Sequence, residues 1–435
     1  MSERYDAILI GAGVIGNAIA FELAKLGWKT LSIDKGPDAG SGSTSSSSAI
    51  IRTYYSVEAS CALAYEGWHY WRDWAAHVNL PPEKPLIRYN ETGCLVIKGP
   101  ANKNLVHVCA MMDRIGCPWV DVPVGKIADY LPGLDLRAYY PPKRPEDDGF
   151  CEPTGGQIAG AVFFPQGGFV NDPKLAACNL KQAAGQNGAQ FLFNAAVAEI
   201  RQQGGRVAGV TLTDGRRIDA PVVINAGGPW SSGLNRMAGV IEGMNITTRA
   251  NRQEVAYIPG PRGFDFGSHG YVYSDGDTET YARPESPGVM CIGSGDPQCD
   301  PREWVDDPDA LDTRFTDQWT VNVMRVAQRF PDLPIPGQAR GIVAMYDVSD
   351  DWLPIYDRSD LPGFYMACGT SGNQFKNAPV AGKIMARIVT ACEAGHDHDA
   401  DPLQFHLERI DRMIDLGTYS RRREVNPNSS FSVIG

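Results

Sequence analysis

Apolar and polar positions follow two regular patterns near the start of the chain. Residues 8–10 are apolar and run directly into glycines at positions 11, 13 and 16. Apolar residues then recur at helical spacing as far as Leu26, and a second apolar stretch covers residues 30–33 before Asp34. Because short apolar runs favour buried strands and a 3.6-residue period favours a helix, residues 8–34 are predicted to form a strand, a glycine turn, a helix and a second strand.

That order, with an acidic residue after the second strand, is typical of a dinucleotide-binding βαβ unit. Gly11 permits the tight turn, Gly13 lets the backbone approach a pyrophosphate at the positive end of the helix, and Gly16 lets the helix pack close to the sheet. Asp34 can accept hydrogen bonds from a ribose. A glycine turn without a ligand would not need the flanking strands, the helix and Asp34 in this order, so the segment is predicted to bind a nucleotide.

The remaining pattern predicts a mixed fold, with antiparallel strands over residues 245–300 and loops over 130–160. A buried strand is expected from residue 222, and it ends in a second glycine turn at 227–228. Helices are expected at 57–79, 102–115, 173–186, 315–329 and 379–393. Further strands are expected at 92–98, 190–193, 197–200, 206–212 and 363–367.

Three glycine turns far apart in the sequence indicate the length of the nucleotide. They lie at residues 11–16, 227–228 and 369–372. A cofactor that touches all three is longer than the part of NAD that one βαβ unit holds, and FAD fits that requirement. The helix from Pro379 would then direct its positive end toward the flavin. An NAD enzyme, which would bind through residues 8–34 alone, is the alternative.

Composition narrows the class of protein further. The chain has 435 residues, too many for one ordinary core, and its 43% hydrophobic and 21% charged residues are typical of a soluble globular protein. A net charge of −11 argues against nucleic acid as a partner. The ten cysteines form no CxxC pair and indicate reduced thiols. No signal peptide or membrane-spanning run is recognised, so a cytoplasmic location is expected.

Each of two polar segments can be interpreted either as an ordinary loop or as a binding site. Residues 36–48 are rich in glycine and serine, but their place after the ribose-binding strand favours contacts with phosphates over a flexible linker. His396 and His398 flank an aspartate, where a solvated loop is favoured over a metal site. No metal is expected.

These motifs together resemble the D-amino-acid oxidase, glycine oxidase and sarcosine oxidase family of FAD enzymes, the DAO family, over nearly the whole length. Besides the first fingerprint, the resemblance rests on residues 42–45 with 50–52, on 225–230, on 344–346 and on 371–376. It implies a glutathione-reductase-type, Rossmann-like FAD domain interleaved with a sheet-rich substrate domain. The implied ranges are 1–90, 150–240 and 335–435 for the FAD domain, and 91–149 and 241–334 for the substrate domain. The implied cofactor-binding residues are Gly11, Gly13, Val14, Ile15, Gly16, Asp34, Lys35, Gly42, Ser43, Thr44, Ser45, Ala49, Ile50, Val197, Ala226, Gly227, Trp230, Tyr346, Gly372, Asn373, Gln374, Phe375 and Lys376.

The resemblance also implies a reaction and its residues. Arg52 and Lys376 would hold a substrate carboxylate over the flavin, as a guanidinium and a buried ammonium can. A hydride would pass from the carbon beside a neutral amine to the flavin, and the resulting imine would be hydrolysed. Tyr281 would face the substrate. Arg283 is expected to pair with Glu285 or Asp277 rather than to bind a second carboxylate.

Three departures from the family pattern limit this expectation. Ala344 stands where some relatives link FAD through a cysteine, so the FAD is expected to be noncovalent. Cys291 stands where an oxygen-activating lysine is found, which favours a dehydrogenase over an oxidase. Asn373 and Gln374 replace a histidine and a glycine, which changes the pocket and leaves the substrate open.

The expected substrate is a small amino acid with a carboxylate, an N-alkyl glycine such as sarcosine. The alternatives are a D-amino-acid or cyclic imino-acid dehydrogenase or oxidase, and a flavoprotein subunit of a multi-subunit amine dehydrogenase. Electrons would pass to O2 or to a carrier protein or quinone, and the oligomeric state stays open. The aromatic helix with Trp68, Tyr70, Trp71 and Trp74 is expected to be core rather than a docking face.

Overall fold

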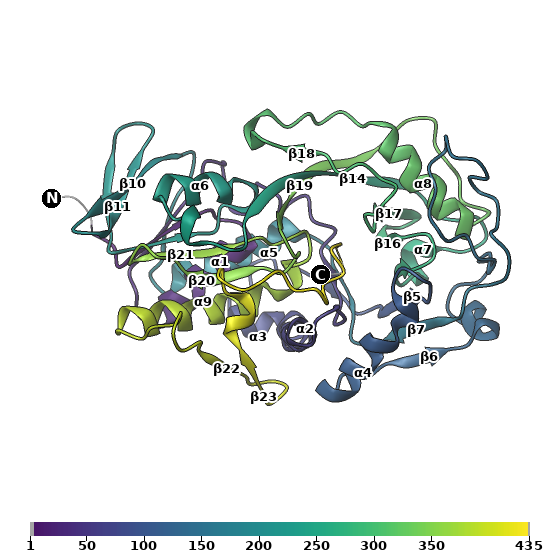
Figure 1. The fold of residues 1–435 in the computed structure, drawn as a ribbon, viewed down its shortest axis with the longest axis horizontal. Coiled ribbons are helices and arrows are strands. Elements are labelled where there is room, and N and C mark those ends of the chain that lie inside the picture. Colours follow the sequence, from purple (N-terminus) through teal and green to yellow (C-terminus); the bar gives the residue numbers. More distant parts are fainter. Residues whose placement is uncertain (1–3, 434–435) are drawn as a thin grey trace.

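The computed structural model describes residues 4–433 and consists of two parts that long strands connect (Figure 1). The first part is built on a six-stranded sheet of order β20-β21-β13-β1-β2-β9, in which only β20 runs antiparallel to its neighbour. Its strands are β1 (Ala7–Ile10), β2 (Thr30–Ile33), β9 (Gln190–Leu192), β13 (Val222–Asn225), β20 (Ile355–Arg358) and β21 (Phe364–Cys368).

The βαβ unit predicted at residues 8–34 is confirmed. Helix α1 (Val14–Lys25) joins the parallel strands β1 and β2, whose register pairs Ala7 with Thr30. The helix packs between α5 (Pro173–Gln186) and α9 (Ala378–Glu393). A side chain at Gly382 of α9 would come within 2.6 Å of Ala18 O, so a glycine is required for this close packing.

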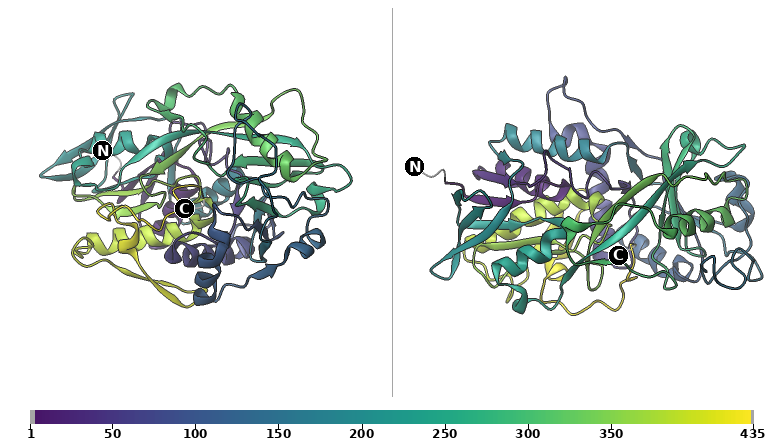
Figure 2. Two further views of the ribbon diagram at one scale, coloured as in Figure 1. Left: turned by 45° about the vertical axis from the view of Figure 1, so that its right-hand side comes forward. Right: turned by 90° about the horizontal axis from the view of Figure 1, so that it is seen from above.

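The second part is a nine-stranded sheet of order β18-β14-β17-β16-β15-β5-β7-β6, with β19 also paired to β14. Figure 2 shows the long strands β14 and β19 running from one part of the molecule to the other. Helix α8 (Asp317–Arg329) packs against this sheet. The strands are β5 (Cys94–Ile97), β6 (Val120–Val122), β7 (Ala161–Phe164), β14 (Thr248–Pro259), β15 (Val272–Asp275), β16 (Thr280–Ser286), β17 (Val289–Ser294), β18 (Trp304–Val305) and β19 (Gly341–Ser349).

The sheets bear on the predicted domain ranges. β7 lies in the range predicted for the FAD domain, as does β19, yet both pair within the nine-stranded sheet. The division into domains stays a prediction, and these two strands are where the observed sheets differ from the predicted ranges.

Smaller elements complete the fold, and the regular elements predicted from the sequence are present. Helix 173–186 begins where Asp172 caps it by accepting a hydrogen bond from Leu175 N. The other helices are α2 (Glu58–Arg72), α3 (Trp74–Val78), α4 (Val106–Ile115), α6 (Ser231–Ala238) and α7 (Phe266–His269). The other strands are β3 (Ile50–Ile51), β4 (Tyr89–Asn90), β8 (Gly168–Val170), β10 (Val197–Gln203), β11 (Arg206–Leu212), β12 (Arg217–Asp219), β22 (Gln404–Leu407) and β23 (Arg412–Asp415).

Burial and helix character bear on three further expectations. Trp68, Tyr70, Trp71 and Trp74 are buried, and Trp71 and Trp74 stack with ring centroids 4.5 Å apart, so the prediction of a core role is confirmed. Within residues 4–433, no helix combines the length and apolar character that a bilayer crossing needs. All ten cysteines are free, as predicted.

Candidate active site

One large cavity of about 1430 Å3 lies between the two parts of the molecule. It is bordered by the glycine turn after β1, by the serine-rich segment after β2, by strands of the nine-stranded sheet and by residues 427–433. Pockets for drug-sized ligands usually measure about 300–1,000 Å3. The cavity therefore has room for a ligand as long as a dinucleotide together with a second small molecule.

Nearly every residue implicated by the sequence lines this cavity. Arg52, Lys376 and Tyr281 do so, as do all the implied cofactor-binding residues except Gly16 and Ser45. A side chain at Gly16 would lie 2.1 Å from Gly11 O, which agrees with a packing role beneath the turn. The Ser45 hydroxyl donates instead to Gly42 O of its own segment, at 2.9 Å.

The end of α1 provides the features of an anion site. Gly13 stands at its N-terminus without a side-chain cap, and the first turn holds no acidic residue. Val14 N donates to Thr44 Oγ1 at 3.0 Å, which draws the serine-rich segment over the turn. The positive end of the helix dipole, with no acidic residue in the first turn, therefore borders the cavity.

Asp34 connects the turn to the following loop. Its Oδ2 accepts from Ala12 N, and its Oδ1 accepts from Gly36 N, both at 2.7 Å. A carboxylate has about four acceptor sites, so the remaining lone pairs can accept from ribose hydroxyls.

Lys376 is a buried ammonium at the other end of the cavity. Its side chain donates to Asn373 O at 2.7 Å and to Tyr55 Oη at 3.1 Å, and the residue is 4% exposed. Within residues 4–433 it forms no ion pair with a carboxylate. Burial, and then the neighbouring Arg52, lower the pKa of Lys376 well below its ordinary value.

The aromatic face of α2 fixes the turn that carries Lys376. Trp71 Nε1 donates to Lys376 O at 2.6 Å, and the Trp71 ring stacks on Phe375 with centroids 5.0 Å apart. A side chain at Gly67 would approach Lys376 O to 2.8 Å, so the helix and the turn are in direct contact. These contacts hold the turn against α2, and Lys376 lines the cavity from this turn.

Arg52 follows β3 and is 7% exposed. Its guanidinium lies against the Tyr55 ring, 4.3 Å from the centroid, and donates to Tyr54 O and, at 2.7 Å, to Val433 O. The two predicted carboxylate-binding cations thus share Tyr55, which lies between them. Burial raises the pKa of Tyr55 to about 12, so its hydroxyl stays protonated.

Tyr281 and Tyr346 form an aromatic wall. Tyr281 Oη lies 3.3 Å from Ser48 Oγ, and burial raises the pKa of Tyr281 to about 12. The Tyr346 ring packs on the backbone of Gly372, where a side chain would come within 2.5 Å of the ring. Arg283 does not line the cavity and pairs with Glu285 at 2.6 Å, which confirms the prediction of a structural pair.

Two features of the cavity were not predicted. Residues 427–433 border it near Arg52, and nothing in their composition marks them as part of a site. Two acidic residues, Glu279 and Asp296, line the wall formed by the β16–β17 hairpin. Their positive φ angles of 49° and 60° were a structural feature that no sequence pattern revealed.

Comparison with known proteins identifies the family. Residues 6–388 match the sequence profile of the DAO family, described as FAD dependent oxidoreductase. The chain belongs to the DAO family.

Individual relatives are distant but cover most of the chain. Glycine oxidase of Geobacillus kaustophilus is 23% identical over 432 residues, 94% of this chain and 99% of that protein. Sarcosine oxidase subunit beta of Rhodobacter capsulatus is 23% identical over 89% of this chain and 85% of its own length. The crystal structure of L-proline dehydrogenase from P. horikoshii superposes with a TM-score of 0.73 at 21% identity, covering 90% of this chain and 95% of that one, which shows a common fold.

DAO-family members are FAD-binding flavoproteins, and the cavity of this chain fits the cofactor. The open N-terminus of α1 suits the pyrophosphate, and the free lone pairs of Asp34 suit a ribose. Ser43 Oγ donates to Met345 O at 3.0 Å and so joins the serine-rich segment to β19 along the cavity. All three predicted glycine turns contribute residues to the cavity lining.

The predicted loop with two histidines needs one correction. His398 is 2% exposed, so the interpretation of a solvated loop is wrong for this residue. Its Nδ1 accepts from Leu403 N at 3.0 Å, and the side chain packs beside the buried Asp357. No cluster of metal-ligating side chains is found within residues 4–433.

Proposed function

We propose that this protein is an FAD-dependent dehydrogenase that oxidises the C–N bond of a small amino acid, an N-alkyl glycine in particular. The observation that carries the proposal is the buried Lys376 ammonium, which borders the cavity beside Arg52 and has no carboxylate partner within residues 4–433. A carboxylate on the substrate supplies the missing charge, because buried cations are stable when they are paired.

The residues of the chain would orient the substrate rather than react with it. Arg52 and Lys376 would hold the carboxylate, the guanidinium through paired hydrogen bonds and the ammonium as a point charge. Tyr281 and Tyr346 would bound the space for the N-substituent and exclude water. FAD, when bound, accepts the hydride from the carbon beside the amine.

The mode of FAD binding follows from Ala344. This residue lines the cavity and offers no thiol for a covalent bond. Cys291, the nearby thiol on β17, is fully buried, does not line the cavity and lies 3.6 Å from Ser48 Oγ. The FAD is therefore proposed to be noncovalent, and acid precipitation of the purified protein is expected to release all of the yellow colour into the supernatant.

The preference for a dehydrogenase rests on Cys291 as well. A cation near the flavin stabilises developing negative charge on oxygen. At the position where the family resemblance places an oxygen-activating lysine, this chain has Cys291, whose thiol stays neutral because burial raises its pKa and which lies behind the cavity lining. The neighbouring Arg283 is held by Glu285 and lies outside the cavity lining.

The test is anaerobic addition of N-methylglycine, larger N-alkyl glycines, D-amino acids and proline to the purified yellow protein. Bleaching by an N-alkyl glycine is expected. Slow reoxidation in air with fast reoxidation by a dye acceptor is then expected for a dehydrogenase. Fast reoxidation in air would contradict the dehydrogenase assignment, and a colourless protein that takes up no FAD would contradict the whole proposal.

A second candidate is a flavoprotein subunit that needs a partner for turnover. The similarity to sarcosine oxidase subunit beta over 85% of that protein favours it. It would be recognised if the protein alone is bleached by substrate but fails to pass electrons to any small acceptor.

A further inference from the structure

The wall of the cavity formed by the β16–β17 hairpin carries two carboxylates. Glu279 precedes β16 and Asp296 follows β17, and the register pairs Thr280 with Ser294. Gly295 N donates to Glu279 O at 2.7 Å, so the backbone segments that carry the two acids are directly linked. Both acids line the cavity that also contains Arg52 and Lys376.

Neither carboxylate has a full set of hydrogen-bond donors among residues 4–433. Asp296 Oδ1 accepts a single hydrogen bond from Gln253 Nε2 at 3.2 Å, and the buried Oδ2 accepts none within the described chain. The Glu279 carboxylate forms no hydrogen bond or ion pair with any residue from 4 to 433. Both acids therefore border the cavity with few hydrogen-bond donors of their own, so a ligand in the cavity that donates hydrogen bonds or carries positive charge would stabilise their ionised form.

The charged groups around the two acids are engaged elsewhere. The cation whose field reaches Glu279 is Arg325, which is bound to Asp300 at 2.6 Å. The cation whose field reaches Asp296 is Arg302, which also lines the cavity; it donates to Phe431 O at 2.7 Å and lies over the Trp352 ring. Asp300 adds a further negative field to both acids.

Tyrosines link this acidic wall to the substrate space. Tyr281 lies two residues after Glu279 and pairs with Gly293, three residues before Asp296, and both Tyr281 and Tyr346 line the same cavity. A substrate whose carboxylate is held by Arg52 and Lys376 would reach the acids by extending past the two tyrosines.

We propose that Asp296 and Glu279 form a subsite for a cationic group, so that the preferred substrate carries a positively charged amine on its N-substituent in addition to the amino-acid carboxylate. The inference rests on the proposed function for the position of the carboxylate. It specifies the substrate as an N-(aminoalkyl) glycine type of molecule, with one end anionic and the other cationic.

The test compares two ligands of equal size, N-(3-aminopropyl)glycine and N-butylglycine, which differ by an ammonium in place of a methyl group. Dissociation constants for the FAD-loaded protein are measured by anaerobic titration calorimetry, and flavin bleaching is recorded in parallel. The wild-type protein is expected to bind the aminopropyl compound at least about tenfold more tightly than N-butylglycine. This difference in binding free energy corresponds to about one close charge interaction.

Matched variants assign the preference to the two acids. Asp296→Asn, Glu279→Gln and the double variant are expected to lower the ratio of affinities stepwise toward one. Asp306→Asn removes the same charge from an exposed position outside the cavity and is expected to leave the ratio unchanged. FAD content, measured for each variant, reports folding.

The outcomes separate the inference from the proposed function. A ratio of one or less in the wild-type protein, a ratio that the double variant keeps, or no measurable binding of either compound would overturn the inference. Bleaching reports the proposed function independently: tight, carboxylate-dependent binding of the aminopropyl compound without bleaching by either ligand would uphold the cation subsite and contradict the oxidation.

The preference is also expected to depend on pH. Burial raises the pKa of Asp296 to about 6 and that of Glu279 to about 7, so both carboxylates gain their charge as the pH rises through this range. An aliphatic ammonium stays protonated there, since its pKa is about 10. The ratio of affinities is therefore expected to be larger at pH 8 than at pH 5.5, and a ratio that does not change with pH would count against the subsite.

Discussion

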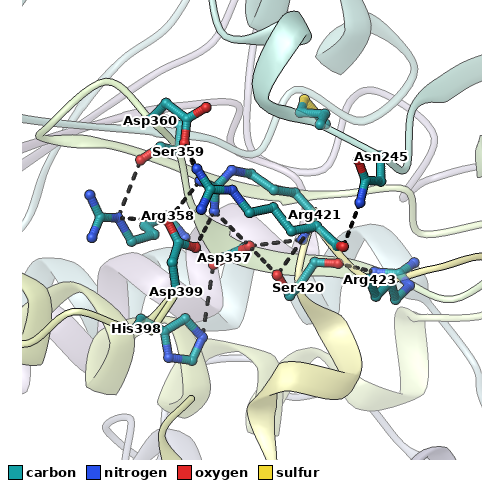
Figure 3. Close-up of polar contacts among 12 residues, drawn as sticks. Asn245, Asp357, Arg358, Ser359, Asp360, His398, Asp399, Ser420, Arg421 and Arg423 are labelled. Atoms are coloured by element: carbon teal, nitrogen blue, oxygen red, sulfur yellow. Dashed lines mark hydrogen bonds and ion pairs between the residues drawn. The ribbon is translucent and has the colours of Figure 1, made fainter. Parts of the chain in front are cut away.

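Arg421 and Lys376 are both buried cations, but their surroundings differ in one respect that separates structure from function. Arg421 is 0% exposed and pairs with the carboxylates of Asp357, Asp360 and Asp399 (Figure 3). Lys376 is 4% exposed and is bound by a carbonyl and a phenol, with no carboxylate at hand within residues 4–433. A cation that the protein itself neutralises holds the fold together, whereas a cation left without an anion marks the place where a ligand brings one.

The same contrast applies to the location of the two cations. The Arg421 network ties the segment after β23 to β20 at the edge of the six-stranded sheet, away from the cavity lining. His398 belongs to that network as a buried neutral neighbour, because burial lowers its pKa. Lys376 instead stands at the turn before α9 and borders the cavity.

Removing Arg421 should have the largest effect on stability. Arg421→Met leaves the buried Asp357 and the partly buried Asp399 without their main cation, and the loss of one partner of a buried pair costs about 3–5 kcal/mol of the free energy of unfolding. Urea unfolding followed by circular dichroism measures this. The FAD spectrum of the protein that remains folded should be unchanged, and a stable variant with altered FAD binding would contradict the separation of the two regions.

Removing Lys376 should affect turnover and spare stability. In Lys376→Met, kcat/KM for an N-alkyl glycine is expected to fall by about 100-fold or more, because the partner of the substrate carboxylate is lost. The unfolding midpoint is expected to stay the same or rise, since an unpaired buried ammonium no longer has to be desolvated. Lys383→Met, the same change at a position of α9 outside the cavity, is the control. A large loss of stability in Lys376→Met would mean that the ammonium is structural.

The depressed pKa of Lys376 predicts how carboxylate binding varies with pH. Without a ligand the ammonium loses its proton well below the ordinary lysine pKa, and a bound carboxylate favours the protonated form. Affinity for acetate should therefore fall as the pH rises above the lowered pKa, by up to about tenfold per pH unit. Titration of the flavin absorbance with acetate between pH 6 and 9 measures this, and Lys376→Met should abolish the dependence.

Lys376 also affects stability through the same pKa. The unfolded chain binds more protons than the folded one between the lowered and the ordinary lysine pKa, so this group makes the folded protein more stable as the pH rises in that interval.

The Asp399 carboxyl affects stability at acidic pH instead. Its pKa is lowered in the folded state, so its contribution is present above its ordinary pKa and is lost in acid.

The smallest expected effect tests whether burial or ion pairing determines how much a residue of the Arg421 network contributes to the free energy of unfolding. Arg422 also pairs with Asp360, at 2.6 Å, but its side chain is 50% exposed. Arg422→Ala is expected to change the free energy of unfolding by less than about 1 kcal/mol, because solvent screens exposed pairs. A loss as large as that of Arg421→Met would show that pairing alone decides the stability.

The sequence was sufficient to predict the local elements and most of the residues that line the cavity. The capped helix at 173–186 and the strand at 30–33 are determined by local apolar periodicity and capping. Both occur with the predicted bounds. The glycine turn could be predicted because a pyrophosphate demands a fixed spacing of backbone groups. The pairing of β7 and β19 within the nine-stranded sheet could not be predicted, since it depends on which strands distant in the sequence lie side by side.

The part of the site that sequence reasoning missed consists of groups whose role depends on packing. Glu279 and Asp296 are ordinary loop acids in the sequence, and only the hairpin brings them to the cavity wall. Tyr55 likewise gains its role by contact with a residue 321 positions away. A family resemblance predicted roles for Arg52 and Lys376 because their positions follow motifs, whereas Glu279 and Asp296 lie outside those motifs.

The most direct test compares the N-alkyl glycine that bleaches the flavin fastest with its primary amide, which lacks the negative charge. Anaerobic bleaching rates are measured in the wild-type protein and in Lys376→Met. The account predicts that the wild-type protein is bleached at least about 100-fold more efficiently by the acid than by the amide, and that Lys376→Met loses most of this difference. Equal bleaching by acid and amide in the wild-type protein would contradict the assignment of Lys376 and Arg52 as the carboxylate site.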